Sequence, residues 1–237
     1  MKTELFKAES RGHADHGWLD THHTFSFARY YNPDRIQFGA LRVVNDDIVI
    51  GGEGFGTHPH DNMEIVSIPL YGALEHKDSM GNGSVIRSGE VQVMSAGTGV
   101  THSEFNADAT LPLNFFQIWV FPNEDNVEPR YGQQQFGFEG NKNKLMQIVS
   151  PDPNDEGLWI HQNAWFNMGT FDKNHTFDYA FKSEGDGLFA MVVEGEFEVE
   201  GQKLLHRDAL GLWDTSSVHI TSLSENARIL LIEVPMF

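Results

Sequence analysis

The chain has 237 residues, of which 40% are hydrophobic and 21% charged, as is usual for a globular protein of one large or two compact domains. Acidic residues number 34 against 16 basic ones, and the net charge of −18 argues against direct binding to a nucleic acid or an anionic membrane surface. Cysteine is absent, which excludes disulfides, thiolate metal sites and a cysteine nucleophile. Any metal ion must therefore be held by His, Asp or Glu.

Targeting signals are missing from the sequence. The first residues carry no apolar signal segment, and no stretch approaches the ~18 apolar residues that a membrane span needs. From these missing signals we expect a cytoplasmic protein with no membrane partner.

Short runs rich in β-branched and aromatic residues, separated by glycine-containing turns, predict an all-β protein. In chain order the clearest of these runs are 48–50, 64–68, 115–120 and 228–232. Long windows with helical periodicity are hard to find. The pattern is typical of a β-sandwich or β-barrel.

Two segments of the chain resemble each other, at 70–94 and at 193–213. Each is a strand, a glycine turn, a second strand and a second turn that leads into an apolar strand, which indicates two similar β-units in tandem. The polar stretch 122–144 is the natural connection between them. We therefore predict two tandem β-barrels, with an N-terminal unit over 1–130 and a C-terminal unit over 131–237, and a monomer as the plain expectation.

Histidine and glutamate recur in phase at two places in the N-terminal unit. His58, His60 and Glu64 share one face if they lie on one strand, and His102 and Glu104 share a face in the same way. If both faces line one barrel interior, three imidazoles and a carboxylate converge. Such a nitrogen and oxygen ligand set suits iron, manganese, nickel, copper or zinc.

A simpler interpretation competes with this one. A His-Xaa-His pair alone is most often surface chemistry, and a single glutamate is usually solvated. Pro59, between the two histidines, also restricts this strand to an edge or an end of a sheet. Two in-phase pairs after glycine-rich turns within one β-unit are much less expected by chance, so we favour a metal site.

These motifs resemble the two sequence motifs of a cupin barrel and, more narrowly, the pirin family. The specific matches cover Arg11 to about Asn106, and the C-terminal half matches in general layout. The matching stretches are 11–27, 57–60, 76–81, 94–99 and 102–104.

The resemblance to pirins implies a bicupin fold and one metal ion in the first barrel, usually iron. Carried over to this sequence, its ligands are His58, His60, His102 and Glu104. Generic cupins instead recruit the glutamate of the first motif, which is Glu64 here, whereas the pirin resemblance gives Glu64 the role of a hydrogen-bonding neighbour that fixes a ligand ring. Spacing alone does not choose between the two glutamates.

The second unit lacks the corresponding pattern. Counting back from Gly195 as from Gly72, the positions that match His58 and His60 fall near Phe181 and Ser183. His219 falls near the position of His102 but has no glutamate two residues further on. We therefore expect a metal-free second barrel with a structural or recognition role.

The resemblance also implies an activity, the quercetin 2,3-dioxygenase reaction, in which a flavonol and O₂ give a depside and carbon monoxide. Glu104 or Glu64 is the expected general base that takes the proton of the flavonol 3-hydroxyl. An alternative is a redox-sensing, iron-bound regulatory protein, whose acidic surface would bind a basic protein partner. A third class is a cupin enzyme with other chemistry, such as an isomerase or a decarboxylase.

The remaining histidines carry weaker signals. His13, His16, His22 and His23 cluster early in the chain, which leaves an N-terminal metal site as an alternative. No carboxylate is recognised in phase with them, so we favour their interpretation as surface residues. His76 is expected at the start of a hairpin, facing solvent.

Overall fold

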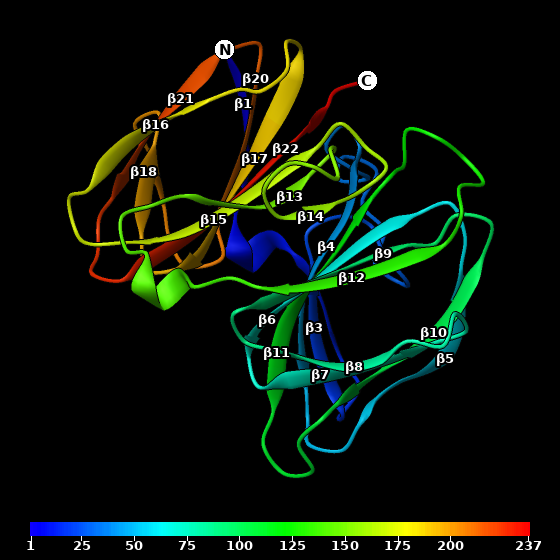
Figure 1. Ribbon diagram of the computed structural model, residues 1–237. Helices are drawn as coiled ribbons and strands as arrows, with labels where there is room; N and C mark the ends of the chain where they lie inside the picture. The colour runs from blue at the N-terminus through cyan, green and yellow to red at the C-terminus, as the bar shows by residue number, and fades with distance from the viewer.

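The computed structural model describes the backbone of residues 1–237 and every side chain except that of Glu139. It is built from strands, with two short 3₁₀ helices, η1 (Ala8–Ser10) and η2 (Phe138–Gly140). The strands form two seven-stranded and two four-stranded sheets, one of each size for each half of the chain (Figure 1). The predicted all-β class is confirmed. The described residues contain no helix long and apolar enough to cross a membrane.

The first half of the chain supplies most of one seven-stranded and one four-stranded sheet. The large sheet consists, in order, of β12 (Arg130–Gln135), β9 (Glu90–Ser95), β6 (Glu64–Tyr71), β11 (Leu113–Val120), β4 (Leu41–Val49), β3 (Leu19–His23) and β2 (Gly12–Asp15). The small sheet consists of β5 (Gly54–His60), β10 (Val100–Asn106), β7 (Ala73–Asp78) and β8 (Gly83–Arg87).

The second half repeats this arrangement. Its large sheet consists of β1 (Lys2–Phe6), β20 (Ala209–Trp213), β17 (Asp186–Glu194), β22 (Ala227–Pro235), β15 (Trp165–Phe171), β13 (Met146–Ser150) and β14 (Leu158–Trp159). Its small sheet consists of β16 (Thr176–Ala180), β21 (Ser217–Ser222), β18 (Phe197–Val199) and β19 (Gln202–Leu204). The large and small sheets stay separate, so each unit is a two-sheet, cupin-like sandwich rather than the closed barrel that we expected.

The two ends of the N-terminal half do not follow the predicted division at residue 130. Strand β1 pairs with β20 of the second large sheet, and Figure 1 shows it in blue beside the orange β20. Strand β12 pairs with β9 of the first large sheet and extends to Gln135. The division into 1–130 and 131–237 remains a prediction, and two strands cross it in their hydrogen bonding.

The main apolar core lies between the two large sheets. Alternation along β11 sends Phe116, Ile118 and Val120 into this shared core, together with Ile232 and Val234 of β22. The other face of β11 carries Phe115, Gln117 and Trp119 into the interior of the first unit. That interior contains two separate apolar clusters with polar side chains between them. The polar layer is where the predicted metal ligands lie.

Candidate metal centre

Three of the predicted ligands meet between β5 and β10. These strands pair antiparallel, and the register sets His58 directly opposite His102. The ring centroids are 4.4 Å apart for His58 and His102, 4.8 Å for His58 and His60, and 4.9 Å for His60 and His102. One nitrogen of each ring lies within 4.8 Å of the others. His102 is buried and the other two are half-buried, so the cluster is reached from one side.

The hydrogen bonding of these rings leaves ring nitrogens free to bind a metal ion. Nε2 of His102 is buried and has no hydrogen-bond partner among the described residues. Nδ1 of His58 lies 2.8 Å from the carbonyl oxygen of Gly56, and a proton donated there leaves Nε2 with its lone pair free. Burial and the neighbouring His58 lower the pKa of His60 to about 4, and burial also lowers the pKa of His102. Neutral imidazoles with free lone pairs are the form that a metal ion binds.

Glu104 adjoins this cluster at His102, in the polar layer. Its Oε1 accepts a hydrogen bond from Ser67 Oγ at 3.2 Å, and its Oε2 accepts one from Gln117 Nε2 at 2.6 Å. One of its carboxylate oxygens lies within 4.8 Å of a ring nitrogen of His102 and of a ring nitrogen of His76. Burial, with a contribution from the charge of Asp47, raises the pKa of Glu104 to about 7. The carboxyl group can therefore exchange a proton near neutral pH.

Glu64 does not share a strand with the histidine pair, so the common face predicted for it was wrong. Strand β5 ends at His60, and β6 begins at Glu64 after a turn in which Asn62 has a φ of 43°. Glu64 is buried, its Oε2 accepts a hydrogen bond from Ser95 Oγ at 2.8 Å, and burial raises its pKa to about 7. Alternation along β6 sets it on the face opposite Ser67, which contacts Glu104.

His76 is a residue whose position we predicted wrongly, because it is buried rather than solvent-facing. Its Nδ1 lies 3.5 Å from Nδ1 of His102, and its Nε2 lies 3.1 Å from Oδ2 of Asp78. The ring of Tyr131 stacks on it at 4.9 Å. The signal was present in the sequence, since Glu75 and Lys77 alternate outward on β7 and leave His76 inside.

The contacts of His76 indicate that it orients His102. If Nε2 of His76 donates to Asp78, its Nδ1 can accept a hydrogen bond from the Nδ1–H of His102, which leaves Nε2 of His102 free for a metal. We expect His76→Phe to weaken metal binding by about 10–100-fold, the usual effect of losing such a partner. Competition with a chelator measures the affinity, with the exposed His206→Phe as the control. An affinity equal to that of the wild type would exclude an orienting role.

Two other buried polar groups of this interior were missed from the sequence. Gln92, which lies opposite Ser67 in the register of β9 and β6, has no partner for its amide among the described residues. Nε1 of Trp119 is equally unpartnered, and its ring lies 4.9 Å from that of His60. Nothing in the local sequence marks these two residues, because only the pairing of distant strands brings them here.

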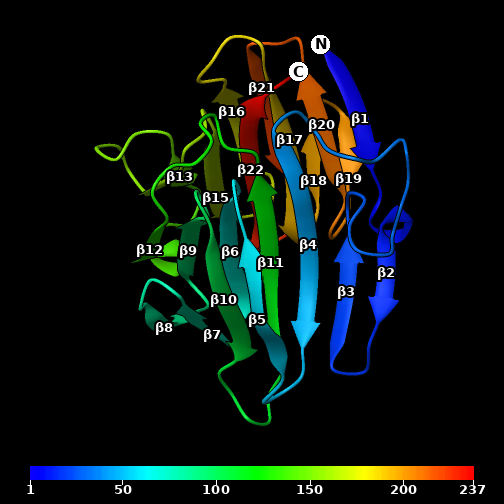
Figure 2. The same cartoon turned by 90° about the vertical axis from the view of Figure 1, so that its right-hand side faces the viewer.

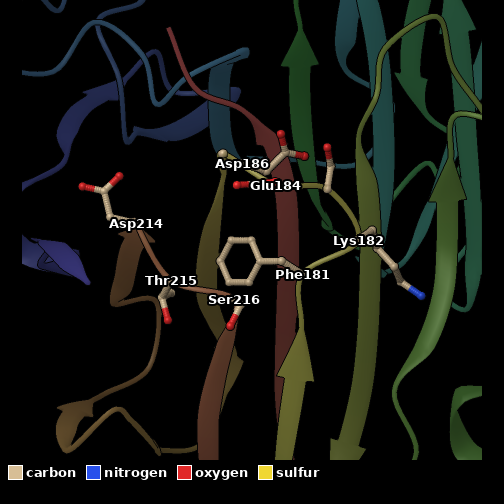
Figure 3. Close-up of a pocket in the computed structure, with 9 residues that line it drawn as sticks. Phe181, Lys182, Glu184, Asp186, Asp214, Thr215 and Ser216 are labelled. Carbon is tan, nitrogen blue, oxygen red and sulfur yellow. The ribbon is translucent and has the colours of Figure 1, made fainter.

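The predicted counterparts in the second unit lie in a different environment. Phe181 and Ser183 line a cavity of about 570 Å³ together with Asp186 and the loop that carries Asp214 (Figure 3). His219 is exposed on β21 and its Nδ1 lies 2.7 Å from Oδ1 of Asp178. The interior face of β22 here carries Ile229 and Leu231 before Glu233, so the second unit is packed mainly with apolar side chains.

The cavity contains a buried carboxyl group that makes stability depend on pH. Burial and the charge of Glu233 raise the pKa of Asp186 from 3.8 to about 7. Below pH 3.8 the group is protonated whether the chain is folded or not, so it has no effect. Between pH 3.8 and about 7 only the unfolded chain ionises readily, so the wild type loses stability as the pH rises.

We therefore expect Asp186→Asn to raise the free energy of unfolding by roughly 2–4 kcal/mol at pH 8 and to leave it unchanged below pH 4. Urea unfolding at both pH values measures the difference. Asp214→Asn, which changes a more exposed carboxylate at the same cavity, is the control. A stabilisation of equal size at both pH values would contradict this assignment.

Comparison with known proteins agrees with the fold. The family model for pirin matches residues 5–120, and the model for the quercetinase C-terminal cupin domain matches residues 147–234. An Escherichia coli K12 protein named quercetin 2,3-dioxygenase is 42% identical over 231 residues, which cover 98% of each chain. The chain belongs to the pirin family. The predicted bicupin architecture of this pirin is thereby confirmed.

Other relatives add to this assignment. The crystal structure of the bacterial pirin YhhW from Escherichia coli, in complex with nickel(II), superposes with a TM-score of 0.94 at 40% identity and full coverage of both chains. A pirin-like protein of Caulobacter vibrioides is 37% identical over 94% of this chain and 95% of its own length. The family thus includes a member that was crystallised with a bound transition metal, in the same fold as this pirin.

Proposed function

We propose that this pirin is an iron-dependent dioxygenase that cleaves flavonols such as quercetin with O₂ and releases carbon monoxide. The observation that carries the proposal is the convergence of three imidazoles, those of His58, His60 and His102, with the buried carboxyl group of Glu104 next to His102. The 42% identity to a protein named quercetin 2,3-dioxygenase, over nearly the whole of both chains, supports the same chemistry.

The three histidines and Glu104 are the residues that we propose to hold the metal. An imidazole and carboxylate set without thiolate suits iron, and it also accommodates zinc, nickel, manganese or copper. A bound metal ion supplies Lewis acidity and a redox centre. The protein supplies the nitrogen ligands, and it fixes at least two of their rings through the Gly56 carbonyl and His76.

Proton transfer is the second task of this site. Flavonol cleavage begins with loss of the 3-hydroxyl proton, and a base with a pKa near the operating pH is the most effective acceptor. We propose that the carboxylate of Glu104 takes this proton, because it lies within 4.8 Å of a ring nitrogen of His102, beside the three imidazoles. Gln117 and Ser67 hold the carboxylate in place through their hydrogen bonds. Glu64 has a similar pKa but faces away from Ser67, so it is the weaker candidate.

Exchange of one glutamate at a time compares Glu104 and Glu64 as candidate bases. We expect Glu104→Gln to lower the rate of quercetin cleavage by about 100-fold or more, as is typical for loss of a general base. The isosteric Glu64→Gln keeps a side chain of the same shape at the hydrogen bond to Ser95 and is expected to retain most of the activity. The opposite ranking of the two variants would assign the base to Glu64.

Metal removal tests the proposal as a whole. Protein stripped with a chelator should lose quercetin cleavage, measured by the fall in flavonol absorbance, and should recover it when ferrous iron is added. Nickel, zinc, manganese and copper added under the same conditions show which metal supports turnover. Full activity in protein shown to be free of metal would refute a metal-dependent dioxygenase, and recovery with another metal but not with iron would refute the choice of iron.

A further inference from the structure

A second group of potential metal ligands lies on the hairpin formed by β2 and β3. His13 and His22 stand directly opposite each other in the register of this pair, and their rings stack with centroids 4.5 Å apart. Asp20 is two residues before His22 and therefore on the same face of β3. The assumption that no carboxylate is in phase with these histidines was wrong, because the Asp20–Thr21–His22 alternation supplies one.

The three side chains point their ligand atoms at one another. Oδ1 of Asp20 lies 3.1 Å from Nε2 of His13 and 3.4 Å from Nδ1 of His22, and all three ligand atoms lie within 4.8 Å of one another. A tetrahedral zinc ion with bonds of about 2.0–2.1 Å separates its ligand atoms by about 3.3 Å. The observed spacings between Asp20 and the two rings are therefore close to the edges of a zinc coordination polyhedron.

We propose that His13, Asp20 and His22 form a second binding site for a divalent transition-metal ion such as Zn²⁺, separate from the cupin centre. The two sites lie on different sheets, since β2 and β3 form one edge of the large sheet and β5 and β10 belong to the small one (Figure 2). Two imidazoles and one carboxylate are a ligand set that zinc, nickel and copper accept.

The solvent exposure of the three side chains determines how an ion reaches this site and how tightly it is held. The three side chains are 50%, 43% and 34% exposed for His13, Asp20 and His22, so an ion can enter from solvent and water can complete its coordination. Three solvent-exposed ligands hold an ion less tightly than the half-buried and buried ligands of the cupin centre. An ion bound here would tie the edge strand β2 to β3, which is itself hydrogen-bonded to β4.

The competing explanation is that Asp20 simply pairs with the two histidines and binds no ion. His219 and Asp178 offer a matched comparison, because they form an exposed His–Asp pair at 2.7 Å with a single imidazole. A pair of this kind lacks the third ligand and is not expected to bind zinc measurably. His219→Ala is therefore the control for removing one exposed histidine from an acidic surface.

Isothermal titration of the chelator-stripped full chain with Zn²⁺ tests the proposal. We expect the wild type and His219→Ala to bind two ions with distinct affinities, and His22→Ala to lose the weaker one. Asp20→Asn should weaken that same ion by at least about ten-fold, the smallest loss expected from altering the surroundings of a metal. Conversely, His58→Ala should keep the weaker ion. A single ion in the wild type, or two undiminished ions in His22→Ala, would overturn the proposal.

Discussion

Replacing His102 by alanine is expected to abolish metal binding at the cupin centre and to reduce quercetin cleavage by more than about 100-fold. This loss exceeds the roughly 10–100-fold that is usual when a residue hydrogen-bonded to a metal ligand is replaced. His102 is 1% exposed and stands at the middle of the cluster, opposite His58 and within 4.9 Å of His60 by ring centroids. Its unpartnered Nε2 has no other role in the described structure.

Metal content by elemental analysis and turnover of quercetin are the two measurements for this variant. His219→Ala, an exposed histidine on the corresponding strand β21 of the second unit, is the matched control. Retention of both metal and turnover in His102→Ala would remove this residue from the site. Loss of turnover with full metal content would show that it acts on the substrate and is not a required ligand.

The largest effect on stability is expected at the junction of the two units, where Arg207 is buried at 8% exposure. Its Nε lies 2.9 Å from Oδ2 of Asp46, and its Nη2 donates to Asn114 at 3.1 Å. Its Nη1 donates to the carbonyl of Val193. The Arg207 guanidinium and the amide of Asn114 outweigh the effect of burial and hold the pKa of Asp46 below its usual value. Removal of one member of such a pair leaves a buried charge without its main partner.

We therefore expect Arg207→Met to lower the free energy of unfolding by about 3–5 kcal/mol. Denaturant unfolding at neutral pH measures the change. Lys2→Met removes an ion pair of similar length, 2.9 Å to Asp214, but with side chains 67% and 56% exposed. That control is expected to cost less than about 1 kcal/mol. Equal effects of the two substitutions would show that the buried pair contributes no more to stability than the exposed one.

The sequence contained most of the information needed for the strands and for the histidine cluster. Glycine turns between β-rich runs specify an all-β chain. The alternation of His58 and His60 on β5 brings both rings close to His102 once β5 and β10 pair. Alternation within one strand was reliable, as the buried His76 between Glu75 and Lys77 shows in hindsight. Alternation does not continue across the turn between His60 and Glu64, and for this reason the face predicted for Glu64 was wrong.

Features that depend on the pairing of strands far apart in the sequence could not be predicted from local sequence patterns. The addition of β1 to the sheet of the second unit rests on backbone hydrogen bonds to β20, which leave no local pattern in the sequence. Gln92 and Trp119 face the site only because their strands are neighbours of β6. Closure of the sheets into barrels depends on strand tilt and register, and periodicity does not specify these.

The most direct measurement is the stoichiometry of gas exchange during quercetin cleavage by the iron-loaded protein. Oxygen uptake and carbon monoxide release would be followed together, in the wild type and in His58→Ala. We predict one carbon monoxide released for each O₂ consumed, with both lost in the variant. Iron-loaded wild-type protein that consumes O₂ without releasing carbon monoxide, or that leaves quercetin unchanged, would contradict a flavonol dioxygenase at this centre.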